Sequence, residues 1–197
     1  VNEALPTTLV EAKPMVRYAL NSGEIIDSHL PGIYNFENIQ LAIAVGKFFQ
    51  LSDEQCNRGI ETYIPNNHRS QFIKIGSNQV LMDAYNANPS SMSAAISHFA
   101  ATDGEPKLLI LGDMFELGKE SEKEHFDLIS FCIRNKFENI FLIGLEFFKH
   151  KNNFDVPFFY KTKKELINHF QKNPITSKHI LIKGSRGMKM EELTNYI

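Results

Sequence analysis

Polar residues and glycines follow four apolar stretches of this sequence. Residues 83–89 (DAYNANP) follow the first stretch and residues 112–118 (GDMFELG) the second, while Gly144 ends the third and residues 183–187 (KGSRG) follow the last. In an open α/β sheet, ligands bind beyond the carboxyl ends of the parallel strands. Any one of these segments could be an ordinary turn, because Asp and Asn favour turns. Together, the four segments predict a binding site at one edge of a sheet.

The side chains of two of these segments suit charged ligands. Hydrogen-bond donors for a carboxylate stand in the last segment, at Lys183, Ser185 and Arg186. Gly184 between them lets a ligand approach the backbone closely. An anion-binding turn without further specificity is the alternative. Asp113 and Glu116 could attract an ammonium group, although acids near a helix start also stabilise the helix dipole.

The segment 112–119 looks like a phosphate-binding P-loop but fails its pattern. Five residues separate Gly112 from Gly118, one too many, and Glu120 stands where Ser or Thr would bind magnesium. No other segment of the sequence supplies a P-loop. The seven histidines lack the spacing of a metal site, so we predict none. His125, in the helix expected after Gly118, faces either the cleft or the solvent.

Short extended runs and two helices are predicted in the first third of the chain. Residues 7–10, 15–20 and 24–26 read as antiparallel strands separated by turns. An apolar helix is expected at about residues 35–49, and a second helix should extend to Thr62 from a capping box of Ser52 and Gln55. Residues 65–67 (PNN) are the best candidate for a linker.

From residue 69 onward, strands alternate with helices. A hairpin is expected from residues 71–75 and 80–83, and buried strands at 107–111, 139–143, 157–160 and 179–182. Helices should begin at Ser90 or Ser91, at Ser121 with Glu124, and at Thr162 with Glu165. This alternation predicts an α/β fold with a Rossmann-like, mostly parallel six-stranded sheet that starts with a hairpin.

The composition narrows the class of protein. With 43% hydrophobic residues, 197 positions suffice for one large domain, or one domain plus a smaller lobe. A net charge of -2 without a basic run argues against nucleic acid or an anionic membrane as partner. No apolar stretch reaches the length of a membrane span, and we expect a cytoplasmic protein in which Cys56 and Cys132 are buried and reduced. Val1 in place of methionine predicts a processed chain or a fragment boundary.

Five segments in order resemble motifs of the Mur ligase family. Three of them are DAYNANPSSM at residues 83–92, LGDMFELG at 111–118, with His125 shortly after, and KGSR at 183–186. Upstream stand LPGIYNFEN at residues 30–38 and NNHR at 66–69. Tyr34 departs from the family pattern, which has His there, while Asn35 and Asn38 match it. The resemblance covers nearly the whole chain from residue 24 onward.

The resemblance implies an ATP-dependent ligase with three domains. Residues 1–64 would be the end of the central ATP-binding domain and residues 65–197 the carboxy-terminal domain, so that this chain by itself should be inactive without a P-loop. ATP and Mg²⁺ are the implied cofactors, with the metal bound mainly outside this chain. A UDP-muramoyl tripeptide and D-alanyl-D-alanine are the implied substrates of a monomer. Another amino acid ligase of the Mur or folylpolyglutamate type, or a binding module without catalysis, is the alternative.

The resemblance also implies roles for single residues at the nucleotide. Asn35 and Asn38, one helical turn apart on the same face, would hold the adenine or ribose, although Asn35 could instead cap its helix. Arg69 would contact the ATP phosphates and Asp83 the ribose or Arg69, as catalytic residues; a surface arginine is the alternative for Arg69. Asn86 and Asn88 would join this pocket or merely shape the turn before Pro89.

The remaining candidate residues would bind the dipeptide. Its carboxylate is assigned by resemblance to Lys183, Gly184, Ser185 and Arg186, and its ammonium group to Asp113 and Glu116. His125 is added to this substrate site because the helix that carries it follows Gly118.

Overall fold

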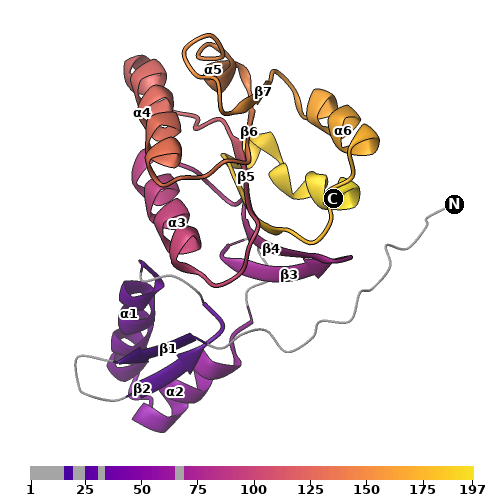
Figure 1. Cartoon of the computed structure of the whole chain (residues 1–197). Coiled ribbons are helices and arrows are strands. Elements are labelled where there is room, and N and C mark those ends of the chain that lie inside the picture. Colours follow the sequence, from indigo (N-terminus) through magenta and orange to yellow (C-terminus); the bar gives the residue numbers. More distant parts are fainter. Residues whose placement is uncertain (1–15, 20–24, 31–33, 65–68) are drawn as a thin grey trace, which may run out of the picture.

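The computed structural model describes residues 16–19, 25–30, 34–64 and 69–197. In the first part of the chain, β1 (Val16–Ala19) and β2 (Ile25–Ser28) pair antiparallel beside α1 (Tyr34–Phe48) and α2 (Asp53–Thr62) (Figure 1). These predicted elements are confirmed. The strand predicted at residues 7–10 and the linker at 65–67 lie outside the described residues.

A six-stranded sheet forms the second part, with the strand order β3-β4-β8-β5-β6-β7. Its members are β3 (Gln71–Ile75), β4 (Asn78–Asp83), β5 (Lys107–Gly112), β6 (Ile140–Ile143), β7 (Phe158–Tyr160) and β8 (His179–Lys183). Only β3 runs antiparallel to its neighbour, so the predicted mostly parallel sheet with an initial hairpin is confirmed. The hairpin turns at Gly76 and Ser77, because Ile75 pairs with Asn78.

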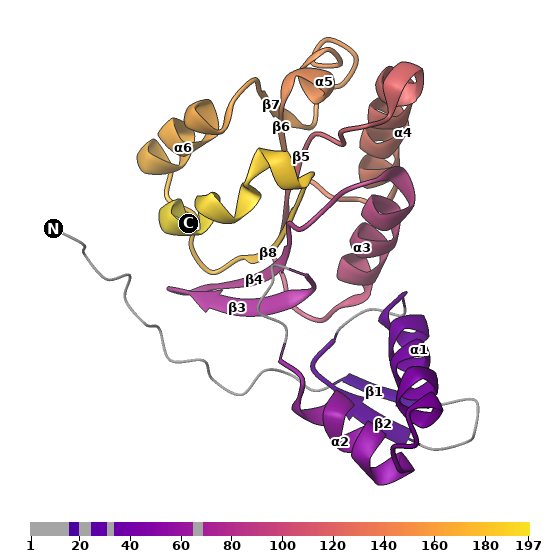
Figure 2. The same ribbon diagram turned by 180° about the vertical axis from the view of Figure 1, so that it is seen from behind.

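Helices cover both faces of this sheet, as Figures 1 and 2 show. One face packs against α3 (Pro89–Ala101) and α4 (Ser121–Arg134), the other against α6 (Lys163–Lys172) and the 3-10 helix η3 (Met190–Tyr196). Short helical turns complete the fold: η1 (Gly118–Glu120), α5 (Leu145–Phe148) and η2 (Arg186–Met188). Successive strand residues point to opposite faces, so Leu109 joins the core under α4 and Ile110 the core under α6. Burial on both faces explains the continuous apolar runs of the strands.

Two helix starts differ from their predictions. Asn88, rather than Ser90 or Ser91, caps α3 and forms the capping box with Ser91. The box predicted at Ser121 is wrong, because η1 precedes α4 directly and the Ser121 hydroxyl donates to Glu146 Oε2 instead. The cap of α2 is confirmed, since Ser52 forms its box with Gln55. Thr162 caps α6 by accepting the backbone N–H of Glu165, but the predicted box is only half formed, because the Glu165 side chain accepts the N–H of Lys161 instead. Cys56 and Cys132 are buried and free, as expected.

A buried polar network around His125 joins α4, the exit of β5 and α5. The imidazole is 0% exposed, so the solvent-facing position predicted as an alternative is wrong. Nε2 accepts the backbone N–H of Met114 at 3.0 Å, which leaves Nδ1–H to donate to the Ser121 carbonyl at 2.7 Å. Burial lowers the pKa of His125, against smaller opposing effects of the Ser121 carbonyl and of Asp113, so folding favours the neutral ring.

We expect His125 to make the folded state less stable in acid. Because its pKa is lowered on folding, its contribution is complete above the pKa of the unfolded chain, about 6.5, and is lost as the pH falls through the folded pKa. His125→Gln removes this titration and keeps a hydrogen-bond acceptor for Met114. Urea unfolding at about pH 7.5 and about pH 5.5 should therefore show a smaller loss of unfolding free energy in the variant than in the wild type. Equal losses would contradict the assignment.

Candidate functional site

A cavity of about 540 Å³ lies where the exits of β4 and β8 meet the beginning of α1. It is within the size range of small-molecule sites. Its lining includes seven of the predicted site residues: Asn35, Asn38, Arg69, Asp83, Asn86, Asn88 and Lys183. The fold therefore brings together side chains from both parts of the chain at the carboxyl edge of the sheet.

An ion pair between Lys183 and Asp83 lies at the base of this cavity. The two residues are register partners on the parallel strands β8 and β4, and Lys183 Nζ lies 2.7 Å from Asp83 Oδ2. The ammonium group also donates to the Asn86 carbonyl at 3.1 Å, and only 3% of the Lys183 side chain is exposed. The predicted pairing of Asp83 with Arg69 is replaced by this contact. Lys183 thus belongs to the cavity beside Asp83, not to an open carboxylate site.

Hydrogen bonds continue from Asp83 to the first turn of α1. The backbone N–H of Ser70 donates to Asp83 Oδ1 at 3.3 Å, and Asn35 Nδ2 lies 3.4 Å from the Ser70 hydroxyl. Asn38 Nδ2 in turn donates to Asn35 Oδ1 at 3.2 Å, which confirms that the two amides share one helix face. Asn35 is the second residue of α1, so the alternative that it caps the helix is wrong.

Arg69 is an exposed residue whose guanidinium stacks on an aromatic ring. Its Cζ atom lies 3.5 Å from the centroid of the Tyr85 ring, a cation–π contact at the rim of the cavity. Tyr85 and Ser70 were not among the residues predicted for the site. Tyr85 stands inside the motif at residues 83–89, but nothing in its local pattern marks it as the partner of Arg69.

The two asparagines after β4 shape the loop that borders the cavity. The Asn86 side chain accepts the backbone N–H of Ala87, and its carbonyl accepts Lys183. Asn88 caps α3 through its side chain. Both therefore have the turn-forming role that was the alternative for them, and both also line the cavity.

The residues after Lys183 face the exit of β5. Ser185 is 2% exposed, and its hydroxyl accepts the backbone N–H of Phe115 at 2.8 Å. Gly184 packs against the backbone of β5, because a Cβ atom there would lie 3.0 Å from Gly112 Cα. Arg186 is exposed and forms an ion pair with Glu191 at 3.2 Å. Of these predicted carboxylate ligands, Arg186 is the one that presents its side chain to the solvent.

The two acids predicted to attract an ammonium group have different environments. Asp113 is 3% exposed and accepts the backbone N–H groups of Glu146 and Phe147, each at 3.0 Å. It therefore caps α5, consistent with the alternative of an acid at a helix start, and Gly144 permits the close approach, because a Cβ atom there would lie 2.1 Å from Asp113 Cγ. Glu116 is exposed. Both ring nitrogens of His125 are occupied in the core, which argues against direct substrate contact by His125.

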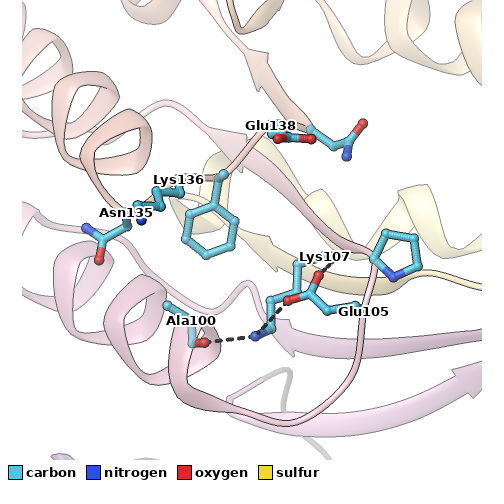
Figure 3. Close-up of a pocket in the computed structure, with 9 residues that line it drawn as sticks. Ala100, Glu105, Lys107, Asn135, Lys136 and Glu138 are labelled. Carbon is cyan, nitrogen blue, oxygen red and sulfur yellow. Dashed lines mark hydrogen bonds and ion pairs between the residues drawn. The ribbon is translucent and has the colours of Figure 1, made fainter.

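A second cavity, of about 330 Å³, lies near the amino ends of β5 and β6. Figure 3 shows the residues that line it. Its most buried charged group, Lys107, donates to the Ala100 carbonyl at 2.8 Å and lies 3.4 Å from Glu105. The ammonium group is thus satisfied by the protein, and the sequence motifs lie at the other edge. We assign no ligand to this second cavity.

Neither a metal cluster nor a membrane helix occurs among the described residues. No group of three or more His, Cys, Asp or Glu side chains in this part of the chain is placed to hold a metal ion. None of the helices built from the described residues combines the length and apolar character needed to cross a membrane.

Comparison with known proteins gives consistent matches. The chain is 35% identical over 171 residues to the UDP-N-acetylmuramoyl-tripeptide–D-alanyl-D-alanine ligase of Bacillus subtilis, which covers 82% of this chain and 37% of the relative. A crystal structure of MurF from Acinetobacter baumannii superposes with a TM-score of 0.77 at 28% identity, covering 92% of this chain and 41% of that one. MurF from Thermotoga maritima, solved with ADP, shares the fold with a TM-score of 0.75 at 16% identity over 92% of this chain and 42% of that one.

This chain therefore spans well under half the length of these relatives. The family model described as "Mur ligase, glutamate ligase domain" matches residues 68–186, which is more than half of the chain and contains the whole six-stranded sheet. On this match, the chain belongs to the Mur ligase family.

Proposed function

We propose that this chain is part of an ATP-dependent ligase that joins D-alanyl-D-alanine to a UDP-N-acetylmuramoyl tripeptide during synthesis of peptidoglycan precursors. The cavity shared by α1 and the exits of β4 and β8 carries this proposal, because it gathers the motif residues in one place. The names of the Bacillus and Acinetobacter relatives support this reaction over that of other amino acid ligases. A cytoplasmic monomer, with ATP as the energy source, fits the proposal.

Each group of cavity residues suits a different part of an adenine nucleotide. The amides of Asn35 and Asn38 offer donors and acceptors for the base or ribose. A carboxylate has about four lone-pair positions, so Asp83 can still accept ribose hydroxyls beside its contacts to Lys183 and Ser70. The guanidinium of Arg69 carries a permanent charge in a planar fork that suits phosphate oxygens. Asn86 completes the border of this nucleotide site.

Positioning and charge stabilisation are the proposed catalytic contributions. In the reaction, ATP would transfer its γ-phosphoryl group to the terminal carboxylate of the tripeptide, which gives an acyl phosphate and ADP. The amine of the dipeptide would then attack the acyl carbon, forming the amide and releasing phosphate. Phosphoryl transfer depends mainly on such placement and on stabilising developing charge. Arg69 would stabilise the phosphate charge, while Arg186 and Glu116, both exposed at the exits of β8 and β5, would bind the carboxylate and ammonium groups of the dipeptide.

We further propose that residues 1–64 belong to a larger domain, the central ATP-binding domain, and residues 65–197 to the carboxy-terminal domain. Among the described residues, the hydrophobic cluster beside α1 has two buried members, Ile26 and Ile39. On the outer side of α1 and just beyond it, Leu41, Val45, Phe48 and Phe49 are exposed by 64%, 48%, 81% and 71%. So small a core and so large an apolar face indicate a unit that packs against further polypeptide of the longer protein.

Arg69→Ala in the full-length protein should lower kcat by at least about 100-fold, because one charge-stabilising donor at a transition state contributes that much. Circular dichroism and thermal unfolding should stay unchanged, since Arg69 is exposed. Arg134→Ala, an exposed arginine at the end of α4, is the matched control. Turnover near the wild-type value in Arg69→Ala would remove the nucleotide assignment.

Arg186→Ala should raise KM for D-alanyl-D-alanine by about 10-fold or more and leave KM for ATP unchanged, because it removes a charged hydrogen bond to the dipeptide carboxylate. Glu191→Gln breaks the Arg186–Glu191 ion pair but keeps the arginine, so it should retain dipeptide binding. Steady-state kinetics with each substrate varied would measure both. An equal rise of both KM values would count against a dipeptide role.

Leu41→Ser should destabilise the full-length protein by about 2–5 kcal/mol, as removal of a buried leucine does, if the outer face of α1 is covered there. Leu145→Ser is the matched control, because Leu145 on α5 is also 64% exposed in this chain. An exposed position should cost at most about 0.5 kcal/mol. Chemical unfolding of the two variants would compare them, and equal effects would contradict the domain assignment.

A further inference from the structure

We propose that Phe115 determines specificity for the amine substrate, by packing its ring against the small apolar side chains of the dipeptide. This inference rests on the proposed function, since it names a residue of the proposed dipeptide site. Phe115 follows Gly112, Asp113 and Met114 at the exit of β5, and it is 45% exposed although its neighbour Met114 is 1% exposed.

The backbone that carries Phe115 is held from two sides. Its own N–H donates to the buried Ser185 hydroxyl at 2.8 Å, and the N–H of Met114 donates to His125 Nε2 at 3.0 Å. Ser185 also donates its backbone N–H to the Asp113 carbonyl at 3.1 Å. The loop between β5 and η1 is therefore tied to the exit of β8 and to α4. Such contacts fix the position from which the Phe115 ring projects.

The ring itself lies over a glycine of the β8 exit. A Cβ atom on Gly187 would lie 2.8 Å from Phe115 Cε2, closer than real Cβ contacts allow, so the glycine leaves the space that the ring occupies. Gly187 directly follows Arg186, so the ring lies against the backbone position next to the proposed carboxylate-binding residue.

The residue after Phe115 has an unusual backbone conformation. Glu116 has φ of +67°, in the left-handed region that residues with a Cβ atom rarely adopt. Conformations of this kind persist where the surrounding structure holds them, and they concentrate at functional sites. The strained residue and the outward-facing aromatic ring are adjacent, and both are exposed at the proposed site.

Other partly exposed aromatic side chains contact another aromatic ring, unlike Phe115. Phe126, 39% exposed, contacts the ring of Phe154 with centroids 4.9 Å apart, and Phe158, 47% exposed, stacks on Phe141 at 5.1 Å. Within the described part of the chain, the Phe115 ring makes no aromatic contact of this kind. An apolar ring that precedes Glu116 by one position in the loop and lies against Gly187, the residue after Arg186, suits a zwitterion with methyl side chains.

The test compares two dipeptides in the full-length protein. We would measure kcat/KM for D-alanyl-D-alanine and for glycylglycine, which lacks both methyl groups, in the wild type, Phe115→Ala, Phe115→Leu and Phe158→Ala. One methyl group in an apolar pocket changes kcat/KM by about 10-fold or more. The preference for D-alanyl-D-alanine should fall about 10-fold in Phe115→Ala and KM for ATP should stay unchanged. Phe115→Leu, which keeps an apolar side chain, should retain most of the preference, and Phe158→Ala all of it.

Gly187→Ala provides a second test. It leaves the Phe115 side chain unchanged, but its added Cβ atom forces the ring out of its position. It should lower the same preference. If the wild type ligates D-alanyl-D-alanine and the preference survives in both Phe115→Ala and Gly187→Ala, the inference is overturned and the proposed function stands. If the folded wild type does not ligate D-alanyl-D-alanine, the proposed function is overturned and the inference with it.

Discussion

The ion pair between Lys183 and Asp83 is the contact on which the site depends. A buried pair is costly unless further hydrogen bonds satisfy both groups, and here the Asn86 carbonyl and the Ser70 N–H do so. Through Ser70 the contacts continue to Asn35 and Asn38 on α1. One chain of polar contacts thus connects the central strand β8 with β4 and with the first part of the molecule. Removing either charge would leave the other buried without its partner.

The position of β8 between β4 and β5 divides the site into two halves. On the β4 side, Lys183 lines the cavity that contains the proposed nucleotide-binding residues. On the β5 side, Ser185 holds the loop that presents Phe115 and Glu116. Lys183 and Ser185, at the exit of β8, therefore support different halves of the site. The proposed phosphate and amine groups would meet beside this strand.

The sequence predicted features that depend on nearby residues, such as strands and helix caps. It did not predict features that depend on a partner distant in the chain. The strands were found from apolar runs, and the caps at Ser52 and Thr162 from the residue three positions later. At Ser121 the same pattern misled, because Glu146, distant in sequence, takes its hydroxyl. His125 is another such case: a lone histidine on a helix has no local sign of burial, and only the packing of α4 against the β5 exit places it in the core.

By itself, the sequence determined which segments leave the sheet and which residue types they carry, because strand periodicity and polar exits are local properties. Their division into the cavity proposed for the nucleotide and the surface proposed for the dipeptide was decided by the tertiary structure alone. The register that sets Asp83 beside Lys183, the stacking of Arg69 on Tyr85 and the capping of α5 by Asp113 each join residues far apart in the chain or from different elements. Sheet order and register arise from packing the entire core, so no local pattern encodes them.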